Sequence, residues 1–109
     1  DFLSKWEPNA YCHYHRHIGP MSVLVLEGEQ HITETTATET VHKVRKPGFF
    51  GRSAGGDVHM ERGGPEGAVV LFMCQAEADG SLFDVLDKQG NILVTATIQS
   101  FLDAQKPKN

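Results

Sequence analysis

Tyr14-His15-Arg16-His17-Ile18-Gly19-Pro20 is the stretch from which the fold and the function of this 109-residue chain are best inferred. Alternate side chains of a β-strand share a face, so a strand here would point His15 and His17 the same way. Two imidazoles about 7 Å apart along a strand can hold one metal ion if a third ligand comes from elsewhere. On their own the two histidines fit an exposed polar strand equally well, and the rest of the sequence must decide.

Length and charge narrow the classes of protein to which the chain can belong. A chain of 109 residues can build one hydrophobic core but not two, so we expect one domain over residues 1–109. It begins at Asp1 rather than Met, and we expect that residues of a longer protein precede it. The net charge of −4 argues against a nucleic-acid or anionic-membrane partner, since both require a basic surface.

The cysteine content and the apolar runs point to a reducing compartment. Cys12 and Cys74 are too few for a disulfide framework, and no secretory signal is visible. No apolar run approaches the ~20 residues that span a bilayer. We therefore expect a cytoplasmic protein.

Short apolar or alternating segments, separated by turn residues, run through most of the chain. About eight such segments at intervals of about ten residues are typical of a β-sandwich or barrel. Turns are expected at 27–29, where Gly28 stands, and at 63–65. The expected strands cover residues 2–6, 10–18, 21–26, 30–36, 41–45, 58–61, 68–74, 81–86 and 91–95.

One segment has a helical pattern. Ile98, Phe101 and Leu102 recur at i, i+3 and i+4, and Thr97 is a suitable N-cap, so we expect one short helix over 98–105.

With strands assigned, the spacing of histidines and glycines resembles that of the cupin superfamily. The first cupin motif is a glycine, five residues, His-x-His, three or four residues, a glutamate and then a glycine. Asn9 replaces the first glycine, and asparagine also tolerates left-handed backbone angles. The glutamate position falls at Met21 or Ser22, and neither can supply a carboxylate. The residues that match are His15, His17 and Gly28.

The second cupin motif, a glycine, five residues, Pro-x-Gly-x-x-His, three residues and an asparagine, is matched some forty residues later. Ala54 replaces the proline and Gly63 the asparagine. The matching residues are Gly48, Gly56 and His59. The resemblance implies an all-β, single-domain cupin, which is a double-stranded β-helix or jelly-roll-like barrel, with one short C-terminal helix.

Within the superfamily the chain most resembles small dioxygenases that cleave dicarbonyl or hydroxyketone substrates, of the acetylacetone-cleaving and 2,4′-dihydroxyacetophenone types. The resemblance covers roughly residues 8–104. It rests on the His-x-His with its following Gly-Pro, on Pro47-Gly48 before the loop to His59, and on Leu82-Phe83-Asp84-Val85-Leu86-Asp87 with Gly90.

The resemblance implies a metal site made by His15, His17 and His59. In the dihydroxyacetophenone branch a downstream glutamate also contacts the metal, and Glu34 is nearest that position, with Glu39 as the second choice. Three neutral imidazoles leave coordination positions open, as oxygen activation at non-haem Fe(II) requires. Fe(II) is the favoured divalent ion, and Zn, Ni, Mn and Cu are the alternatives because imidazole suits all of them.

The implied reaction joins a small-molecule substrate and O2. The substrate would chelate Fe(II) through two oxygens, and a carbon–carbon bond would break to give two carbonyl or acid products. A substrate pocket would be lined by apolar side chains, and Arg52 is a candidate for contacting a substrate oxygen. The apolar candidates are Leu24, Leu26, Phe49, Phe50 and Phe72.

Other side chains near the motif leave alternatives open. His13 and His15 form a rival ligand pair, although the Gly-Pro after His17 favours His15 with His17. Cys12 is either a fourth, thiolate ligand or a buried thiol. Arg16 points away from its histidine neighbours, so we expect a surface or subunit contact. His31 and His42 lie on polar strands and are expected at the surface.

Two further functions fit the same sequence. One is a non-catalytic metal-binding cupin, such as a zinc-binding sensor or regulatory domain. The other is a metal-free cupin that binds a metabolite or uses its histidines as acid and base in an isomerase. Since cupin sheets have edges, and Phe2, Leu3 and Trp6 lie near a terminus, we expect a homo-oligomer, either a dimer or a tetramer.

Overall fold

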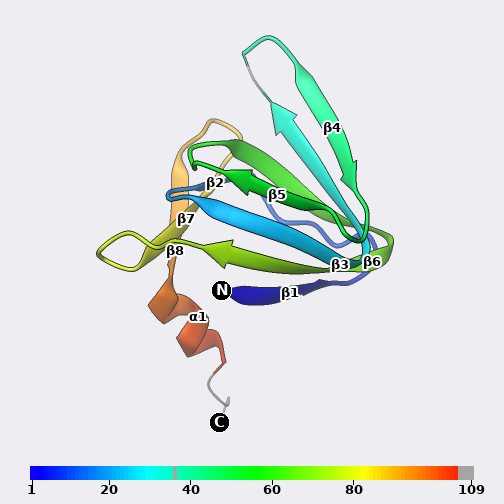
Figure 1. Ribbon diagram of the computed structural model, residues 1–109. Coiled ribbons are helices and arrows are strands. Elements are labelled where there is room, and N and C mark those ends of the chain that lie inside the picture. The colour runs from blue at the N-terminus through cyan, green and yellow to red at the C-terminus, as the bar shows by residue number, and fades with distance from the viewer. Residues whose placement is uncertain (36, 106–109) are drawn as a thin grey trace.

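The computed structural model describes residues 1–35 and 37–105 (Figure 1). In this part of the chain, eight strands precede one short C-terminal helix, so the structure is all-β as expected. The elements are β1 (Phe2–Trp6), β2 (His15–His17), β3 (Met21–Thr35), β4 (Thr40–Arg45), β5 (Phe50–Ser53), β6 (Val58–Cys74), β7 (Ser81–Leu86), β8 (Ile92–Thr97) and α1 (Ile98–Ala104).

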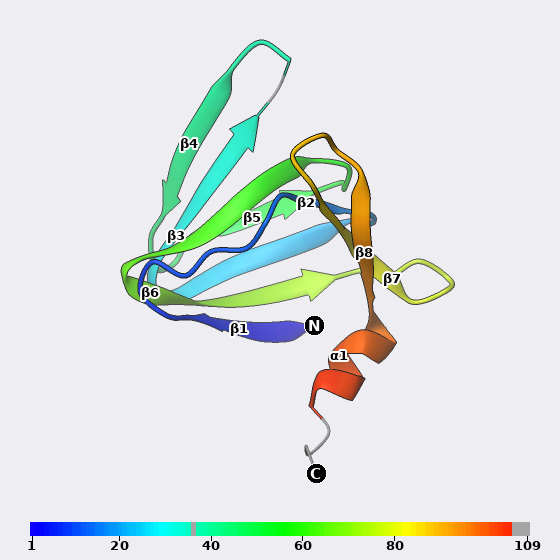
Figure 2. The same ribbon diagram turned by 180° about the vertical axis from the view of Figure 1, so that it is seen from behind.

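The two longest strands, β3 and β6, organise the sheet by pairing antiparallel along most of their length. The first half of β3 pairs with the second half of β6, and these halves also pair with β5 and β1. The second half of β3 pairs with β4, and the first half of β6 pairs with β2. Strand β2 also pairs with β7, which in turn pairs with β8. Figure 2 shows β7 and β8 crossing beside the other strands, while β4 and the second half of β3 project away together.

Two expected turns are strand interiors instead. Residues 27–29 and 63–65 were expected to separate strands, but β3 and β6 run through them, with register shifts near Gly28. Gly28 has φ +69° and Gly67 has φ +81°, and a Cβ on Gly28 would lie 2.1 Å from the carbonyl oxygen of Gly67. Glycine therefore allows two bent strands to stay paired through a bulge. Thr36, the expected end of one strand, lies outside the described residues.

The expected strand over 10–18 is shorter than predicted. Only His15–His17 pairs regularly, and Tyr11 makes an isolated bridge to Arg62. This short β2 nevertheless lies between β6 and β7, because His15 pairs with both His59 and Val85.

The core lies on one face of β3 and β6. Alternate residues of β3 are buried, including Val23 and Val25, whereas Leu24 and Leu26 lie on the opposite face. Each fully buried side chain of this kind contributes about 1.5–3 kcal/mol through removal of apolar surface from water. The buried apolar cluster consists of Met21, Val23, Val25, Ala68, Val70 and Phe72.

The C-terminal hairpin and helix are close to the prediction. The Asp87 carboxylate accepts hydrogen bonds from the backbone N–H groups of Gln89 and Asn91, at 2.9 and 2.8 Å, which fixes the turn. Thr97 and Ser100 form a capping box at the start of α1. The Phe101 ring stacks on Phe2, with centroids 4.7 Å apart, and so fastens α1 to β1. No helix in the described part of the chain is long and apolar enough to span a membrane.

Candidate metal centre

The His-x-His stretch forms β2, and strand alternation sorts its three side chains. His15 and His17 are buried, at 6% and 3% exposure. Arg16 points to the other face, where its guanidinium donates to the Asp84 carboxylate at 3.2 Å. The expected outward direction of Arg16 is confirmed, and within this chain its partner is Asp84.

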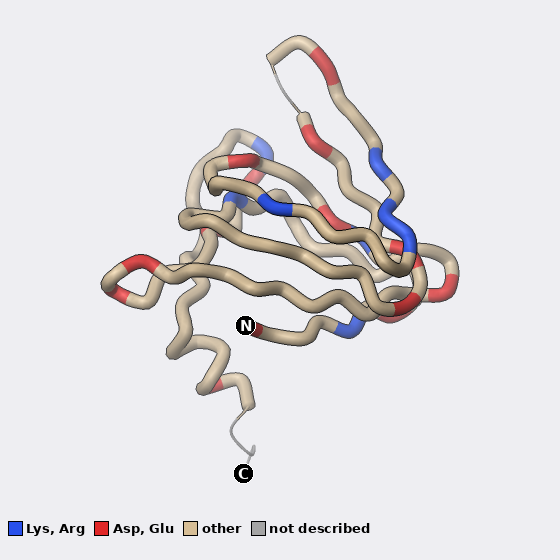
Figure 3. The backbone as a smooth tube through the Cα atoms, viewed as in Figure 1, with Lys and Arg blue, Asp and Glu red and all other residues tan. Residues whose placement is uncertain are grey.

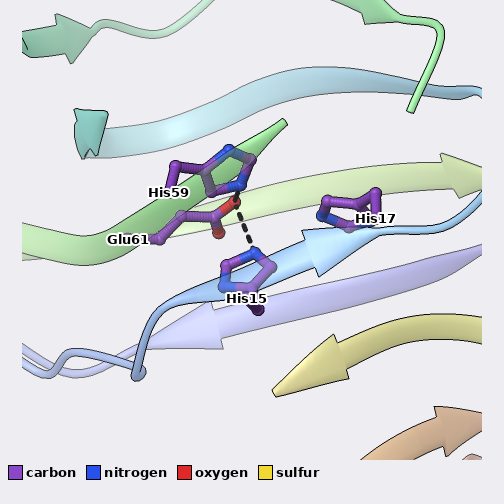
Figure 4. A group of neighbouring side chains, drawn as sticks. All are labelled: His15, His17, His59 and Glu61. Carbon is purple, nitrogen blue, oxygen red and sulfur yellow. Dashed lines mark hydrogen bonds and ion pairs between the residues drawn. The ribbon is translucent and has the colours of Figure 1, made fainter. Parts of the chain in front are cut away.

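Strand β6 brings the distant ligands. His59 is the direct register partner of His15, and the two rings lie 4.5 Å apart between centroids. Glu61 follows His59 by two positions on the same strand, so it faces the same way. One ligand atom from each of four buried side chains lies within 4.8 Å of the others (Figure 4); they are His15, His17, His59 and Glu61.

The Glu61 carboxylate is held from three sides. Oε1 accepts a hydrogen bond from His59 Nε2 at 2.9 Å and lies 3.4 Å from His15 Nε2. Oε2 accepts from Gln30 Nε2 at 3.2 Å. Burial raises the pKa of Glu61, but the hydrogen bonds and charges of the two histidines outweigh it, and the pKa lies well below its usual range. Glu61 is therefore an ionised carboxylate.

His15 is oriented through its other ring nitrogen. Nδ1 donates to the His13 carbonyl oxygen at 3.2 Å and lies 3.5 Å from Cys12 Sγ. This contact directs Nε2 toward Glu61, as partners on the far nitrogen of metal-binding histidines do. Burial lowers the pKa of His15, but the hydrogen bonds to Cys12 and Glu61 more than compensate and raise it to about 10. Without a metal, His15 is protonated at neutral pH.

The pKa of His17 is shifted in the opposite direction from that of His15. Burial, followed by the positive charge of His15, lowers its pKa to about 4, so its ring is neutral. Both ring nitrogens are buried and have no hydrogen-bond partner. A buried polar atom without a partner costs about 1–3 kcal/mol, and a cation bound by a lone pair of His17 would offset this cost. Three imidazoles and one carboxylate suit Fe(II), Zn and related divalent ions, so the residues present fit a metal.

Solved structures share this architecture. An acetylacetone dioxygenase from Acinetobacter johnsonii aligns with a TM-score of 0.72 and 14% identity. The alignment covers 94% of this chain and 64% of the dioxygenase chain. The Drosophila melanogaster CENP-C cupin domain aligns with a TM-score of 0.53 and 19% identity. That alignment covers 64% of this chain and 55% of the CENP-C chain. This chain has the cupin fold. The same Drosophila protein bound to CAL1 matches with a TM-score of 0.54, also at 19% identity.

No protein-family model and no curated protein sequence matches the chain. At these identities the likeness to the solved structures establishes the fold alone.

The structure brings together the three predicted histidines but not the predicted glutamate. Glu34 is the register partner of His59, yet its carboxylate accepts hydrogen bonds from Lys43 Nζ at 3.3 and 3.4 Å. The carboxylate of the group is Glu61, and neither Glu34 nor Glu39 belongs to it. The spacing of His59-Met60-Glu61 carried the missed signal, because it repeats the two-residue period of the His-x-His.

The rival ligands lie outside the group. Cys12 approaches only the Nδ1 side of His15, and His13 contributes its backbone carbonyl. His42 is exposed and His31 half-buried, and their rings contact each other at 3.1 Å between nitrogens.

Two cavities reach the histidine group of this cupin. One of about 210 Å³ borders on His15, His17 and Glu61, and its other walls are mostly aromatic, including Trp6 and Phe83. The other, of about 200 Å³, borders on His59 and is lined by charged side chains of β4 and β5.

The predicted pocket residues divide between these cavities and the outer surface. Phe72 lines the aromatic cavity, and Phe49 and Arg52 line the charged one. The structure does not place the remaining three in either cavity. Leu24 lies on the face opposite the core, and Leu26 and Phe50 are 44% and 55% exposed. Their apolar character reflects an outer sheet face.

Proposed function

We propose that this cupin is a metal-dependent dioxygenase, with non-haem Fe(II) as the favoured ion, that cleaves a carbon–carbon bond of a small dicarbonyl or hydroxyketone substrate with O2. The buried group of three imidazoles and Glu61 is the observation that carries the proposal. The cupin fold shared with an acetylacetone dioxygenase supports the reaction class.

The residues of the chain would divide the work between holding the ion and controlling its surroundings. A divalent ion bound here would polarise a substrate carbonyl and supply the redox chemistry for O2. The His13 carbonyl fixes the tautomer of His15, and Gln30 holds Glu61 in place. Phe72 and Phe83 line the aromatic cavity and would limit the access of bulk water to the buried group.

The test is anaerobic reconstitution with Fe(II), followed by oxygen-uptake measurements with β-dicarbonyls and hydroxyketones and product analysis by mass spectrometry. We expect uptake with at least one compound, and loss of both iron and uptake in His17→Ala. Exposed His42→Ala is the matched control and should keep both. Iron demonstrably bound, with no uptake from any compound, would count against the proposal.

A non-catalytic zinc cupin, acting as a sensor or regulatory domain, is the second candidate. His15, His17, His59 and Glu61 would supply the four donors that a closed structural zinc site requires. The CENP-C cupin domain was solved in complex with CAL1, so a domain of this fold can bind a partner protein, which supports a regulatory role but says nothing of zinc. Metal analysis of protein purified without added metal separates the two, since tightly held zinc in full occupancy favours the sensor.

We also propose a cytoplasmic location. Cys12 and Cys74 are both free thiols, as expected in a reducing compartment.

A further inference from the structure

The cavity beside His59 has an excess of basic side chains. Figure 3 shows Lys and Arg positions on β4 and β5, and side chains of both strands line this cavity. Two carboxylates also line the cavity, so the pairing of each charge decides what the cavity can bind. The charged residues of its wall are Glu34, Lys43, Arg45, Arg52 and Asp57.

Three of these five charged side chains have partners, whereas Arg52 makes no ion pair or restraining hydrogen bond among the described residues. Lys43 binds Glu34, and Asp57 accepts a hydrogen bond from Ser53 Oγ at 3.0 Å. Arg45 has no ion pair to a carboxylate among the residues that the structure describes. Its contacts are a hydrogen bond from Nη1 to Gln30 Oε1 at 3.4 Å and the Phe49 ring, 4.8 Å from the guanidinium carbon.

Arg45 is therefore a half-buried guanidinium that two neighbours restrain and that makes no direct ion pair among the described residues. Burial lowers the pKa of Arg45, and the charges of Glu61 and Glu34 act in the opposite direction. Gln30 and Phe49 restrain the side chain, so little rotamer entropy remains to be lost when an anion binds. A guanidinium fork matches the two oxygens of a carboxylate.

The neighbouring groups connect Arg45 to the metal centre. Gln30, 1% exposed, accepts from Arg45 through Oε1 and donates to Glu61 through Nε2. A ligand at Arg45 would thus lie one side chain away from Glu61, with His59 in the same cavity wall. The aromatic cavity on the other side has no lysine or arginine among its described wall residues, so it offers no comparable site for an anion.

We propose that Arg45 binds a carboxylate of the substrate, and that the substrate is a small oxo acid whose carbonyl end lies toward His59. This rests on the proposed function, because it names the substrate class of the same site. The cavity of about 200 Å³ limits the size of the ligand, since pockets for drug-sized molecules measure roughly 300–1,000 Å³.

Two probes with almost the same skeleton test the proposal. Acetoacetate carries a carboxylate where acetylacetone carries an uncharged acetyl group. Each is titrated by calorimetry into Fe(II)-loaded protein without oxygen, and into metal-free protein. We expect Arg45→Gln to weaken acetoacetate binding by about tenfold or more and to leave acetylacetone binding within about twofold. Arg45→Lys, which keeps the charge but not the fork, should give an intermediate loss.

Arg62→Gln is the matched control, because it removes the same charge from a residue that contacts Asn9 and His31 and lies outside both cavities near the metal group. It should leave the binding of both compounds unchanged. Equal losses for the two probes in Arg45→Gln would indicate a merely structural role and overturn the proposal. So would unchanged acetoacetate binding, or none in the wild type.

Oxygen uptake, measured separately, distinguishes this inference from the proposed function. Arg45-dependent acetoacetate binding without uptake from any compound supports the carboxylate site and contradicts the dioxygenase. Oxygen uptake with acetylacetone, together with acetoacetate binding that is unchanged in Arg45→Gln, supports the dioxygenase and contradicts the carboxylate site.

Discussion

The proton on His15 makes metal binding depend on pH. Its pKa is raised to about 10, so near neutrality an entering ion must displace this proton, whereas His17, with a pKa lowered to about 4, is already neutral. We expect the affinity for Zn²⁺ or Fe²⁺ to rise about tenfold per pH unit between about pH 6.5 and 8. Calorimetry in buffers of different ionisation enthalpy should detect about one proton released per ion, and a pH-independent affinity would contradict this assignment.

The same two histidines give the metal-free protein a stability that falls on both sides of neutrality. The raised pKa of His15 stabilises the fold fully below its unfolded-state value of 6.5, and this contribution is lost as the pH rises through about 10. The lowered pKa of His17 has the opposite sign, so its contribution is present above 6.5 and is lost as the pH falls through about 4. Urea unfolding at pH 4, 7 and 10 measures both limbs, and His15→Gln should flatten the alkaline one.

The identity of the carboxylate in the group can be tested with a pair of variants. Glu61→Gln removes an ionised, buried partner of His15 and His59, so we expect at least about tenfold weaker metal binding and about 3–5 kcal/mol lower stability without metal. Glu34→Gln breaks only the partly exposed pair with Lys43 and should cost about 0–1 kcal/mol. Metal titration and denaturant unfolding distinguish the two variants. A larger loss of metal affinity in Glu34→Gln than in Glu61→Gln would favour Glu34 as the ligand.

At the residue scale the sequence predicted the histidines better than the carboxylate. The motif spacing indicated His15, His17 and His59, and the structure brings them together. The resemblance implied Glu34, on β3, as the carboxylate. The structure instead places Glu61, on β6, beside the histidines. The two-residue spacing of His59 and Glu61 indicates a shared strand face, and the pairing of His59 with His15 shows that this face meets the His-x-His.

At the element scale, glycine is ambiguous in a sequence. Gly28 and the pair Gly63-Gly64 were interpreted as turn residues, which is the commoner use of glycine between apolar segments. Here β3 and β6 continue past them, because partners distant in the chain supply the hydrogen bonds that a turn would end. Neighbouring residues alone carry no information about such pairing. By contrast, the hairpin near Asp87 and the cap at Thr97 are local and were predicted correctly.

Two glycines with similar backbone angles test the role of the bulge. Gly28→Ala would place a Cβ 2.1 Å from the Gly67 carbonyl oxygen, in addition to its positive φ of +69°. Gly48→Ala, at φ +91°, meets nothing within 4 Å and should show only the backbone cost of about 1–2 kcal/mol. We expect Gly28→Ala to lower the free energy of unfolding by at least about 2 kcal/mol more than Gly48→Ala does. Equal losses in chemical denaturation would mean that the strands tolerate a side chain at the bulge.

At the scale of the whole molecule, an apolar row crosses the outer face of the sheet. Leu3, Leu71, Leu24 and Phe50 stand in register on β1, β6, β3 and β5, and the two end residues are 62% and 55% exposed. Exposed apolar patches of this kind mark association surfaces. We propose that this face, which we call the outer row, pairs with a second copy of the chain.

Light scattering coupled to size exclusion tests the outer row. We expect a dimer or tetramer for the wild type and a monomer for the double variant Leu3→Lys with Phe50→Lys, since two buried charges would oppose pairing. Leu93→Lys is the control, because Leu93 is equally exposed, at 60%, but lies on β8. A wild type that stays monomeric at high concentration would contradict the proposal.

The three histidines and Glu61 of the buried group come from only two strands, and one of these, β2, is three residues long. An ion gripped there would act as a removable cross-link between the beginning and the middle of the chain. Without the ion, residues 7–14, the segment between β1 and β2, would be held mainly by the Tyr11 bridge and a few backbone hydrogen bonds. In a metal-starved cell this segment would become more accessible to proteases, so the abundance of the protein would follow its metal supply.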